Sequence, residues 1–249
     1  MKPLLAALRF LTILPIPGDW GTAEDDLARS VPWFPVVGLL LGAVAAAAAW
    51  VLPMVAPPLV VAVAIVVVLL SFSGCLHLDG LADTADGCLS SRPRERILET
   101  MKDSHTGAMG VIAMVCVLLA KFASLASLPA DVLWPAVLLM PLAGRSAIVI
   151  HMALLPYARP SGLGTIFYRR RPRWAAVWAA GVLAAVAWGL LGWRGLIVAA
   201  FCLAVTLALS AYVYRKIGGA TGDTFGAVCE IIEVVPALML ALGPLGGVR

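Results

Sequence analysis

The sequence contains very little charge. Asp, Glu, Lys and Arg make up 13% of its 249 residues, against about 25% in an ordinary globular domain. Hydrophobic residues make up 62%, and the mean hydropathy is +0.99. So few polar side chains cannot cover the outside of a water-soluble protein of this size. The composition therefore excludes a soluble globule and predicts that membrane lipid surrounds most of the surface.

Two further absences narrow the class of protein. The formal charge is only +4, which does not favour a nucleic-acid partner. The cysteines are odd in number and lack the C-x-x-C or Cys/His spacing of a disulfide framework or a zinc site. We interpret them as small apolar packing residues: Cys75, Cys88, Cys116, Cys202 and Cys229.

Long apolar runs divide the chain. A helix needs about 20 apolar residues to cross a bilayer, and seven segments approach this length: 33–52, 57–74, 108–128, 132–151, 174–192, 195–214 and 226–243. The stretch 2–17 ends at two prolines without a small-residue cleavage site, so we expect an interfacial helix there and no signal peptide. The predicted fold is all-α: a polytopic integral membrane bundle of about seven transmembrane helices, plus this N-terminal helix, in one domain over 1–249.

The basic residues predict how the bundle is oriented. If the spans alternate and the N-terminus faces the cytoplasm, every long polar loop is cytoplasmic. Of the 18 Lys and Arg residues, only Lys121, Arg145, Arg194 and Arg249 then fall elsewhere, as the positive-inside rule requires. The cluster formed by Arg169, Arg170, Arg171 and Arg173 fits this topology signal. We therefore expect a protein of the bacterial cytoplasmic (inner) membrane with its active site facing the cytoplasm.

Three carboxylates follow the second apolar run. Asp79, Asp83 and Asp86 are spaced i, i+4 and i+7, which places them at about 0°, 40° and −20° on a helix. Such a stripe repels itself, and a divalent cation would compensate it. Carboxylate oxygens favour Mg²⁺, Mn²⁺ or Ca²⁺ over zinc. The alternative is a solvated loop whose aspartates cap a helix and bind backbone amides. His77 falls on the opposite face, as a hydrogen-bonding neighbour.

A second polar group precedes the third span. Asp103 is a candidate metal ligand or general base there, and Lys102 or His105 is placed to meet phosphate oxygens. The alternative is that Asp103 and Ser104 only cap the next helix.

A third polar group opens the last span. Asp223 and Glu230 share a helical face, and Gly222 suits backbone contact with a phosphate at a helix start. Carboxylates within an apolar span indicate function by default. The alternative is an interhelical ion pair with Arg145, a residue that could equally neutralise a substrate phosphate.

These motifs together resemble the cobalamin synthase family, the adenosylcobinamide-GDP ribazoletransferases. The resemblance extends along the whole chain, in the family's order, and its most specific part is His-Leu-Asp-Gly-x-x-Asp at 77–83. The segments that carry it are 8–15, 34–38, 77–83, 101–104 and 221–223, with Glu230.

The resemblance implies a reaction. A ribose hydroxyl of α-ribazole, or of its 5′-phosphate, attacks the cobinamide-proximal phosphate of adenosylcobinamide-GDP, GMP leaves, and adenosylcobalamin or its phosphate forms. Mg²⁺ is the implied cofactor. Carboxylate-held metal is a usual way to neutralise charge on a leaving phosphate. Spacing and resemblance together give six candidate metal ligands: Asp79, Asp83, Asp86, Asp103, Asp223 and Glu230. The candidate catalytic residues are Asp86 and Asp103, one of which could serve as the general base, and His77. Lys102, Arg145 and Gly222 are candidate substrate-binding residues.

Two other interpretations deserve a test. The segment Asp83-x-x-Asp86-Gly87 resembles the opening of the metal motif of CDP-alcohol phosphotransferases, but Ser90 and Ser91 depart from its continuation. A cation- or proton-coupled transporter would also carry acids within its spans. A transporter concentrates them near the middle of the bilayer, whereas the richest cluster here is in a loop. The oligomeric state, including a homo-oligomer, stays open.

Overall fold

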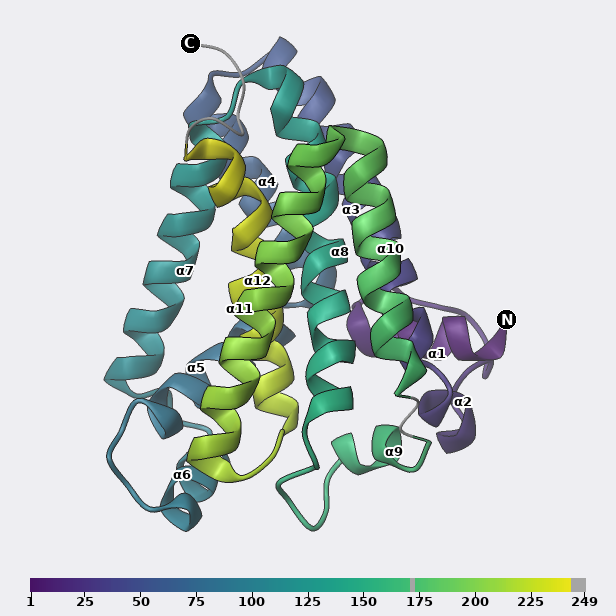
Figure 1. The fold of residues 1–249 in the computed structure, drawn as a ribbon, viewed down its shortest axis with the longest axis vertical. Coiled ribbons are helices and arrows are strands. Elements are labelled where there is room, and N and C mark those ends of the chain that lie inside the picture. The colour runs from purple at the N-terminus through teal and green to yellow at the C-terminus, as the bar shows by residue number, and fades with distance from the viewer. Residues whose placement is uncertain (171–172, 243–249) are drawn as a thin grey trace.

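The computed structural model describes residues 1–170 and 173–242, and in this part of the chain the only regular elements are helices (Figure 1). A single isolated β-bridge joins Tyr157 and Ala220. Arg171 of the predicted basic cluster and Gly243, the predicted end of the last span, lie outside the described residues.

The predicted spans are confirmed as helices. They are α3 (Phe34–Val51), α4 (Pro58–Ser73), α7 (Ala108–Ala126), α8 (Ala130–Leu154), α10 (Trp174–Leu191), α11 (Trp193–Ile217) and α12 (Gly222–Ala241). Six of them are long and apolar enough to cross a membrane; for α3 this length includes its short 3-10 extensions η1 (Val31–Trp33) and η2 (Leu52–Met54). Helix α4 is long enough only when it is counted together with α5 (Leu76–Cys88). The shorter helices are α1 (Lys2–Leu11), α2 (Glu24–Ala28), α6 (Arg94–Thr100) and α9 (Gly164–Tyr168).

The chain bends by 89° between α4 and α5. Gly74 has a φ of +56° and Cys75 a φ of +62°, the left-handed conformation that reverses the path of a helix at its C-terminus. Cys75 is the one non-glycine residue with positive φ in the described part of the chain. The bend directs α5 across the bundle, so we treat α5 as lying outside the membrane-crossing segments.

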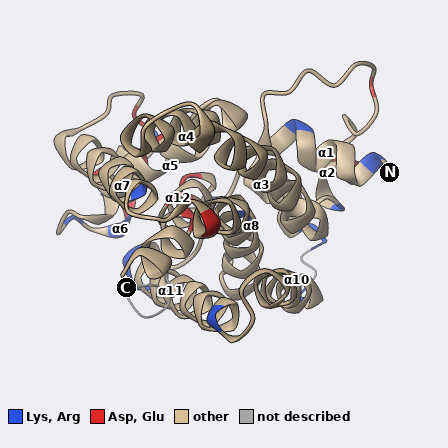
Figure 2. Ribbon diagram, turned by 90° about the horizontal axis from the view of Figure 1, so that it is seen from above, with Lys and Arg blue, Asp and Glu red and all other residues tan. Residues whose placement is uncertain are grey.

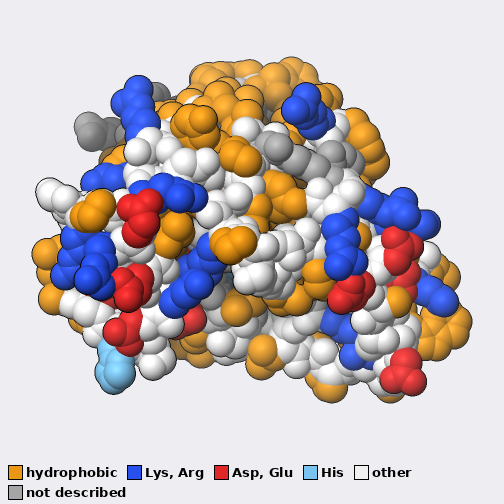
Figure 3. Space-filling model, turned by 90° about the horizontal axis from the view of Figure 1, so that it is seen from below, with side chains coloured by type: hydrophobic (Ala, Val, Ile, Leu, Met, Phe, Trp, Pro, Cys, Tyr) orange, Lys and Arg blue, Asp and Glu red, His pale blue; other side chains and the backbone are white. Residues whose placement is uncertain are grey.

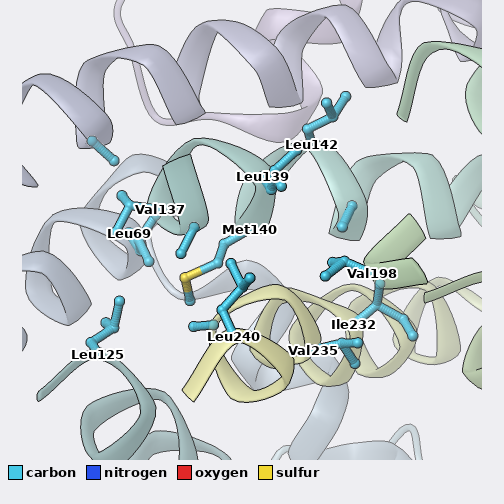
Figure 4. Close-up of a cluster of buried hydrophobic side chains, with 14 of the residues drawn as sticks. Leu69, Leu125, Val137, Leu139, Met140, Leu142, Val198, Ile232, Val235 and Leu240 are labelled. Atoms are coloured by element: carbon cyan, nitrogen blue, oxygen red, sulfur yellow. The ribbon is translucent and has the colours of Figure 1, made fainter. Parts of the chain in front are cut away.

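Helices α8 and α12 form the centre of the bundle. Buried residues make up 83% of the apolar window of α8 and 78% of that of α12, against 22% in α7 and α10. Figure 2 shows the other long helices arranged around this pair. Leu139 and Met140 of α8 pack with Ile232, Val235 and Leu240 of α12 in the largest hydrophobic cluster (Figure 4). Apolar side chains predominate around both helices, as in other buried helices.

Polar segments gather at one end of the molecule. The connections from α5 to α7, from α8 to α10 and from α11 to α12 all lie there, with α1 and α2 beside them (Figure 1). Figure 3 shows charged side chains spread over this face, with hydrophobic side chains at its margins. Arg169 binds Glu24 at 2.6 Å and Arg170 binds Asp25 at 3.0 Å, which ties the α9 segment to α2. The predicted alternation of the spans is therefore correct.

Candidate active site

Helix α5 presents three carboxylates on one face. Asp79 is exposed, and Asp83 and Asp86 are partly exposed, while every other residue from Asp79 to Cys88 is buried. His77 is buried on the opposite side of this helix. The predicted stripe is thus formed, at the polar end of the bundle.

Close packing brings the start of α12 against α5. A Cβ atom at Gly80 would lie 2.7 Å from the carbonyl oxygen of Asp223, and one at Gly226 would lie 2.7 Å from the carbonyl oxygen of His77. Real Cβ atoms do not approach backbone so closely, so only glycine allows the two helices to cross at this point. The crossing places Asp223 beside the α5 stripe.

The electrostatics of Asp83 show that these carboxylates act on one another. The pKa of Asp83 is raised to about 6, first by partial burial and then by the negative charges of Asp79, Asp223 and Asp86, against the opposing effect of Arg159. We call Asp79, Asp83, Asp86 and Asp223 the aspartate cluster. It concentrates more negative charge than its one neighbouring guanidinium can balance.

Arg159 is a member of the site that sequence reasoning counted only as a topology signal. Its Nη2 donates to Asp223 Oδ2 at 2.6 Å. The two loops that carry them are joined by backbone hydrogen bonds, from Ala158 N to Ala220 O and from Ala220 N to Pro156 O, both 2.8 Å. Arg159 Nε is buried without a hydrogen-bond partner. No local periodicity in the sequence marks this loop residue.

A series of side-chain hydrogen bonds fixes the start of α12. Thr221 and Thr224 form a capping box. Thr224 Oγ1 also lies 3.2 Å from Nε2 of the buried His151, whose Nδ1 lies 2.8 Å from Ser210 Oγ. Thr221 Oγ1 donates to Asp223 Oδ2 at 3.3 Å. These contacts fix the orientation of Asp223; of the supporting residues, only Thr221, within the segment 221–223, belongs to a motif named in the sequence analysis.

Asp86 also forms hydrogen bonds with the start of α7. Its two oxygens accept hydrogen bonds from the backbone amides of Gly107, at 2.7 Å, and Gly110, at 2.9 Å. These are unpaired amides at the N-terminus of α7, which favours a negative charge. For Asp86 the capping alternative therefore describes the structure better than the roles of metal ligand or base.

Asp103 lies apart from the aspartate cluster. It accepts hydrogen bonds from His105, at 3.0 Å from the backbone N and 2.7 Å from Nδ1. The hydrogen bonds from His105 lower the pKa of Asp103. Asp103 and Lys102 are both exposed on the loop before α7, and no recorded contact within the described residues joins Asp103 to the α5 stripe. Gly107 and Gly110, not Asp103, bring this end of the loop to the stripe, through their hydrogen bonds to Asp86.

Glu230 and Arg145 require a correction, because both are buried among the spans. Glu230 Oε2 lies 2.6 Å from Lys121 Nζ, and Glu233 pairs with the same ammonium at 2.8 Å and with Arg145. Figure 2 shows acidic positions of α12 enclosed by the surrounding helices. Two cations and two anions satisfy one another here. The alternative of an interhelical ion pair is the one formed, with Glu233 as the partner of Arg145.

A cavity of about 160 Å³ opens beside the aspartate cluster, and we call it the rim cavity. It lies among α1, α5, α8, α9 and α12, and its lining includes Asp79, Asp223, His77 and Gly222. Gly222 is exposed at the start of α12, as a backbone contact to substrate would require. The cavity brings the acidic rim and the predicted glycine to one place.

No preformed metal centre of three or more His, Cys, Asp or Glu side chains occurs among residues 1–170 and 173–242. Asp86 is turned toward α7 and Asp223 toward Arg159, which separates the carboxylate oxygens. The donor set of Asp79, Asp83 and Asp223 nevertheless suits a hard divalent cation, because it consists of oxygens with excess negative charge.

Comparison with known proteins decides the family. A family described as Cobalamin-5-phosphate synthase matches residues 3–241. The chain belongs to the cobalamin-5-phosphate synthase family. Synthase relatives named adenosylcobinamide-GDP ribazoletransferase include one from Roseiflexus sp. (strain RS-1), 43% identical over 96% of this chain and 89% of the relative. Others come from Geotalea daltonii, 38% identical over 99% of both chains, and Pseudomonas putida (strain GB-1), 41% identical over 98% of this chain and all of the relative.

Membership in the cobalamin-5-phosphate synthase family agrees with the transferase interpretation and not with the transporter alternative. No solved structure matches this chain.

Proposed function

We propose that this protein joins α-ribazole, or its 5′-phosphate, to adenosylcobinamide-GDP with release of GMP. Family membership supports this activity. The observation that carries the proposal is the aspartate cluster at the polar end, where Asp79, Asp83 and Asp223 interact across α5 and α12. Transfer at a phosphoanhydride needs concentrated positive charge around the phosphates. The carboxylates of this cluster could bind a divalent cation that supplies this charge.

Mg²⁺ is the proposed cofactor, held by Asp79, Asp83 and Asp223. When bound it supplies positive charge to the phosphoanhydride as the oxygen of GMP leaves. Arg159 positions Asp223, and its unpartnered Nε is available to donate to a phosphate oxygen.

The protein's own carboxylates handle the proton in this proposal. A ribose hydroxyl attacks the cobinamide-proximal phosphate and must lose its proton. Asp79 is exposed and borders the rim cavity, so the oxygen of its carboxylate that does not bind the metal accepts that proton. The backbone at Gly222 faces open space at the edge of the rim cavity, because a Cβ atom there would meet nothing within 4 Å.

We propose that the site faces the cytoplasm of a bacterial cell, in the inner membrane. The support is the distribution of basic residues, which concentrate in the loops at the end that carries the aspartate cluster (Figure 3). The nucleotide-bearing substrate would then reach the site from the compartment that contains nucleotides, while lipid surrounds the spans.

The experiment measures GMP release from adenosylcobinamide-GDP and α-ribazole by the purified protein in detergent, with and without Mg²⁺. We expect Mg²⁺-dependent release that Asp83→Asn abolishes. Asp131→Asn is the matched control, because Asp131 is an exposed acid at the start of α8 on the opposite end of the bundle. Absence of release by the wild-type protein, together with ion-coupled uptake into vesicles, would contradict the transferase proposal and support the transporter alternative.

A further inference from the structure

The rim cavity is apolar except at its opening. Its inner wall includes Phe10 and Phe167, whose ring centroids lie 4.8 Å apart, together with Phe225 and Ile148. Asp79 and Asp223 stand at the acidic side. This division suits a ligand with a flat apolar part and a polar part beside it.

His77 lines the rim cavity and carries one unsatisfied polar atom. The residue is 3% exposed and lines the rim cavity, and its Nδ1 is buried without a hydrogen-bond partner. Most buried polar atoms in proteins are hydrogen-bonded, since an orphan loses its interaction with water without replacement. A ligand in the rim cavity could supply the missing partner once the His77 ring turns its Nδ1 toward it.

The rim cavity is too large to be a packing defect. Its 160 Å³ of space compares with the roughly 15 Å³ that a single water needs on the same kind of measure. Leu163, 58% exposed, stands at its edge. A ring system can therefore enter from the polar end.

Under the proposed function two ring systems compete for this space. Guanine carries several hydrogen-bonding groups on its edge, which an apolar wall would leave unpaired at a cost of about 1–3 kcal/mol each. The dimethylbenzimidazole of α-ribazole is apolar and, once attached to ribose, has a single free ring nitrogen that only accepts. One acceptor matches the one unpartnered nitrogen of His77, a residue that lines the cavity.

We propose that the rim cavity binds the benzimidazole ring of α-ribazole against Phe10 and Phe167, and that the His77 ring turns on binding so that its Nδ1–H donates to the free ring nitrogen. This inference rests on the proposed function and deepens it. His77 is then a substrate-binding residue. With the benzimidazole ring in the cavity, the ribose would lie between Asp79 and Asp223, beside the proposed proton acceptor Asp79.

The test is equilibrium binding of α-ribazole and, separately, of GMP to the purified protein in nanodiscs without the second substrate. This measurement requires no transfer. We expect His77→Phe to weaken α-ribazole binding about tenfold and His77→Gln, which keeps a donor, to restore part of it. Leu163→Trp, at an exposed position, should block the opening without endangering the fold. GMP binding should change less than twofold in all three.

Ala200→Phe is the matched control. Ala200 lines a separate apolar cavity among α8, α10 and α11, so an added ring there should leave α-ribazole binding unchanged. Weakened GMP binding with intact α-ribazole binding would assign the cavity to guanine and overturn the inference. Unchanged binding of both ligands would show that the cavity holds neither base, and it would also overturn the inference.

Failure of the proposed function gives a different result. One possible result is that wild-type protein binds α-ribazole and the variants weaken that binding, but no GMP is released in the presence of both substrates and Mg²⁺. In that case the transfer proposal fails while the cavity assignment stands. If GMP is released normally by wild type and by Leu163→Trp alike, with equal KM for α-ribazole, the cavity assignment fails and the transfer proposal stands.

Discussion

Arg159 Nη2 donates a hydrogen bond to Asp223 Oδ2 across 2.6 Å, although the two residues are 64 positions apart. The pair joins the loop after α8 to the first turn of α12. It also places a guanidinium beside the aspartate cluster, where it opposes the mutual repulsion that raises the pKa of Asp83. A single arginine thus orients one carboxylate and moderates the charge of the others.

Replacing Arg159 should impair the reaction more than the fold. Arg159→Gln removes a partly buried charge-assisted hydrogen bond, and we expect kcat/KM for adenosylcobinamide-GDP to fall about tenfold or more. Steady-state kinetics of GMP release would measure this. Arg169→Gln is the control, because the ion pair of Arg169 with Glu24 is exposed on both sides and should contribute under about 1 kcal/mol. Equal losses in both variants would argue against a special role for Arg159.

Mg²⁺ activation should depend on pH through Asp83. Its pKa of about 6 in the folded protein lies above the ordinary value of 3.8, so the folded state binds the proton more tightly than the unfolded state. In metal-free protein the contribution of Asp83 to stability should therefore decrease as pH rises from about 4 to about 6. Because Mg²⁺ competes with this proton, its apparent affinity should fall as pH drops below about 6.

Titrating Mg²⁺ at several pH values in the GMP-release assay would check the competition. Asp83→Asn, assayed by thermal unfolding in Mg²⁺-free detergent solution, should remove the change in stability between pH 4 and 6. A wild-type affinity for Mg²⁺ that stays constant from pH 5 to 7 would count against Asp83 as a ligand.

The buried ionic group should support the fold instead of the chemistry. Lys121→Met leaves Glu230 unpaired among the spans and should cost about 3–5 kcal/mol. Adding Glu230→Gln removes that uncompensated charge and should restore much of the loss, which a double-mutant cycle of unfolding in detergent would measure. Reduced Mg²⁺ affinity in Glu230→Gln at unchanged stability would instead return Glu230 to the metal site.

Asp86 should behave as an anchor for α7. Asp86→Ala loses the acceptor for Gly107 and Gly110 and should destabilise the protein by about 1–2 kcal/mol without Mg²⁺. Asp86→Asn keeps one acceptor oxygen and should cost less. Thermal unfolding and hydrogen exchange at 107–110 would measure both. A loss that appears only when Mg²⁺ is present would identify Asp86 as a ligand.

The stripe on α5 and the spans were predictable because both depend on short-range periodicity. Apolar runs of about 20 residues need lipid or burial wherever they fold, and the spacing of Asp79, Asp83 and Asp86 places them on one side of any helix. Asp103 was assigned from its place in a polar loop, and Glu230 from the helical face that it shares with Asp223, and neither observation fixes the partner of the side chain. Asp103 turns to its neighbour His105, and Glu230 finds Lys121, 109 residues away.

The sequence by itself determined that this is an integral membrane protein, that its long loops lie on the same side of the bundle, and that carboxylates cluster where those loops begin. These properties follow from hydropathy, charge placement and helical periodicity, which act within one segment. Only the tertiary structure decided which charges meet: Arg159 with Asp223 at the rim, and Lys121 with Glu230 in the core. Helix crossings such as that at Gly80 and Gly226 set those partners, because the cost of a buried charge depends on which residue of another helix lies opposite.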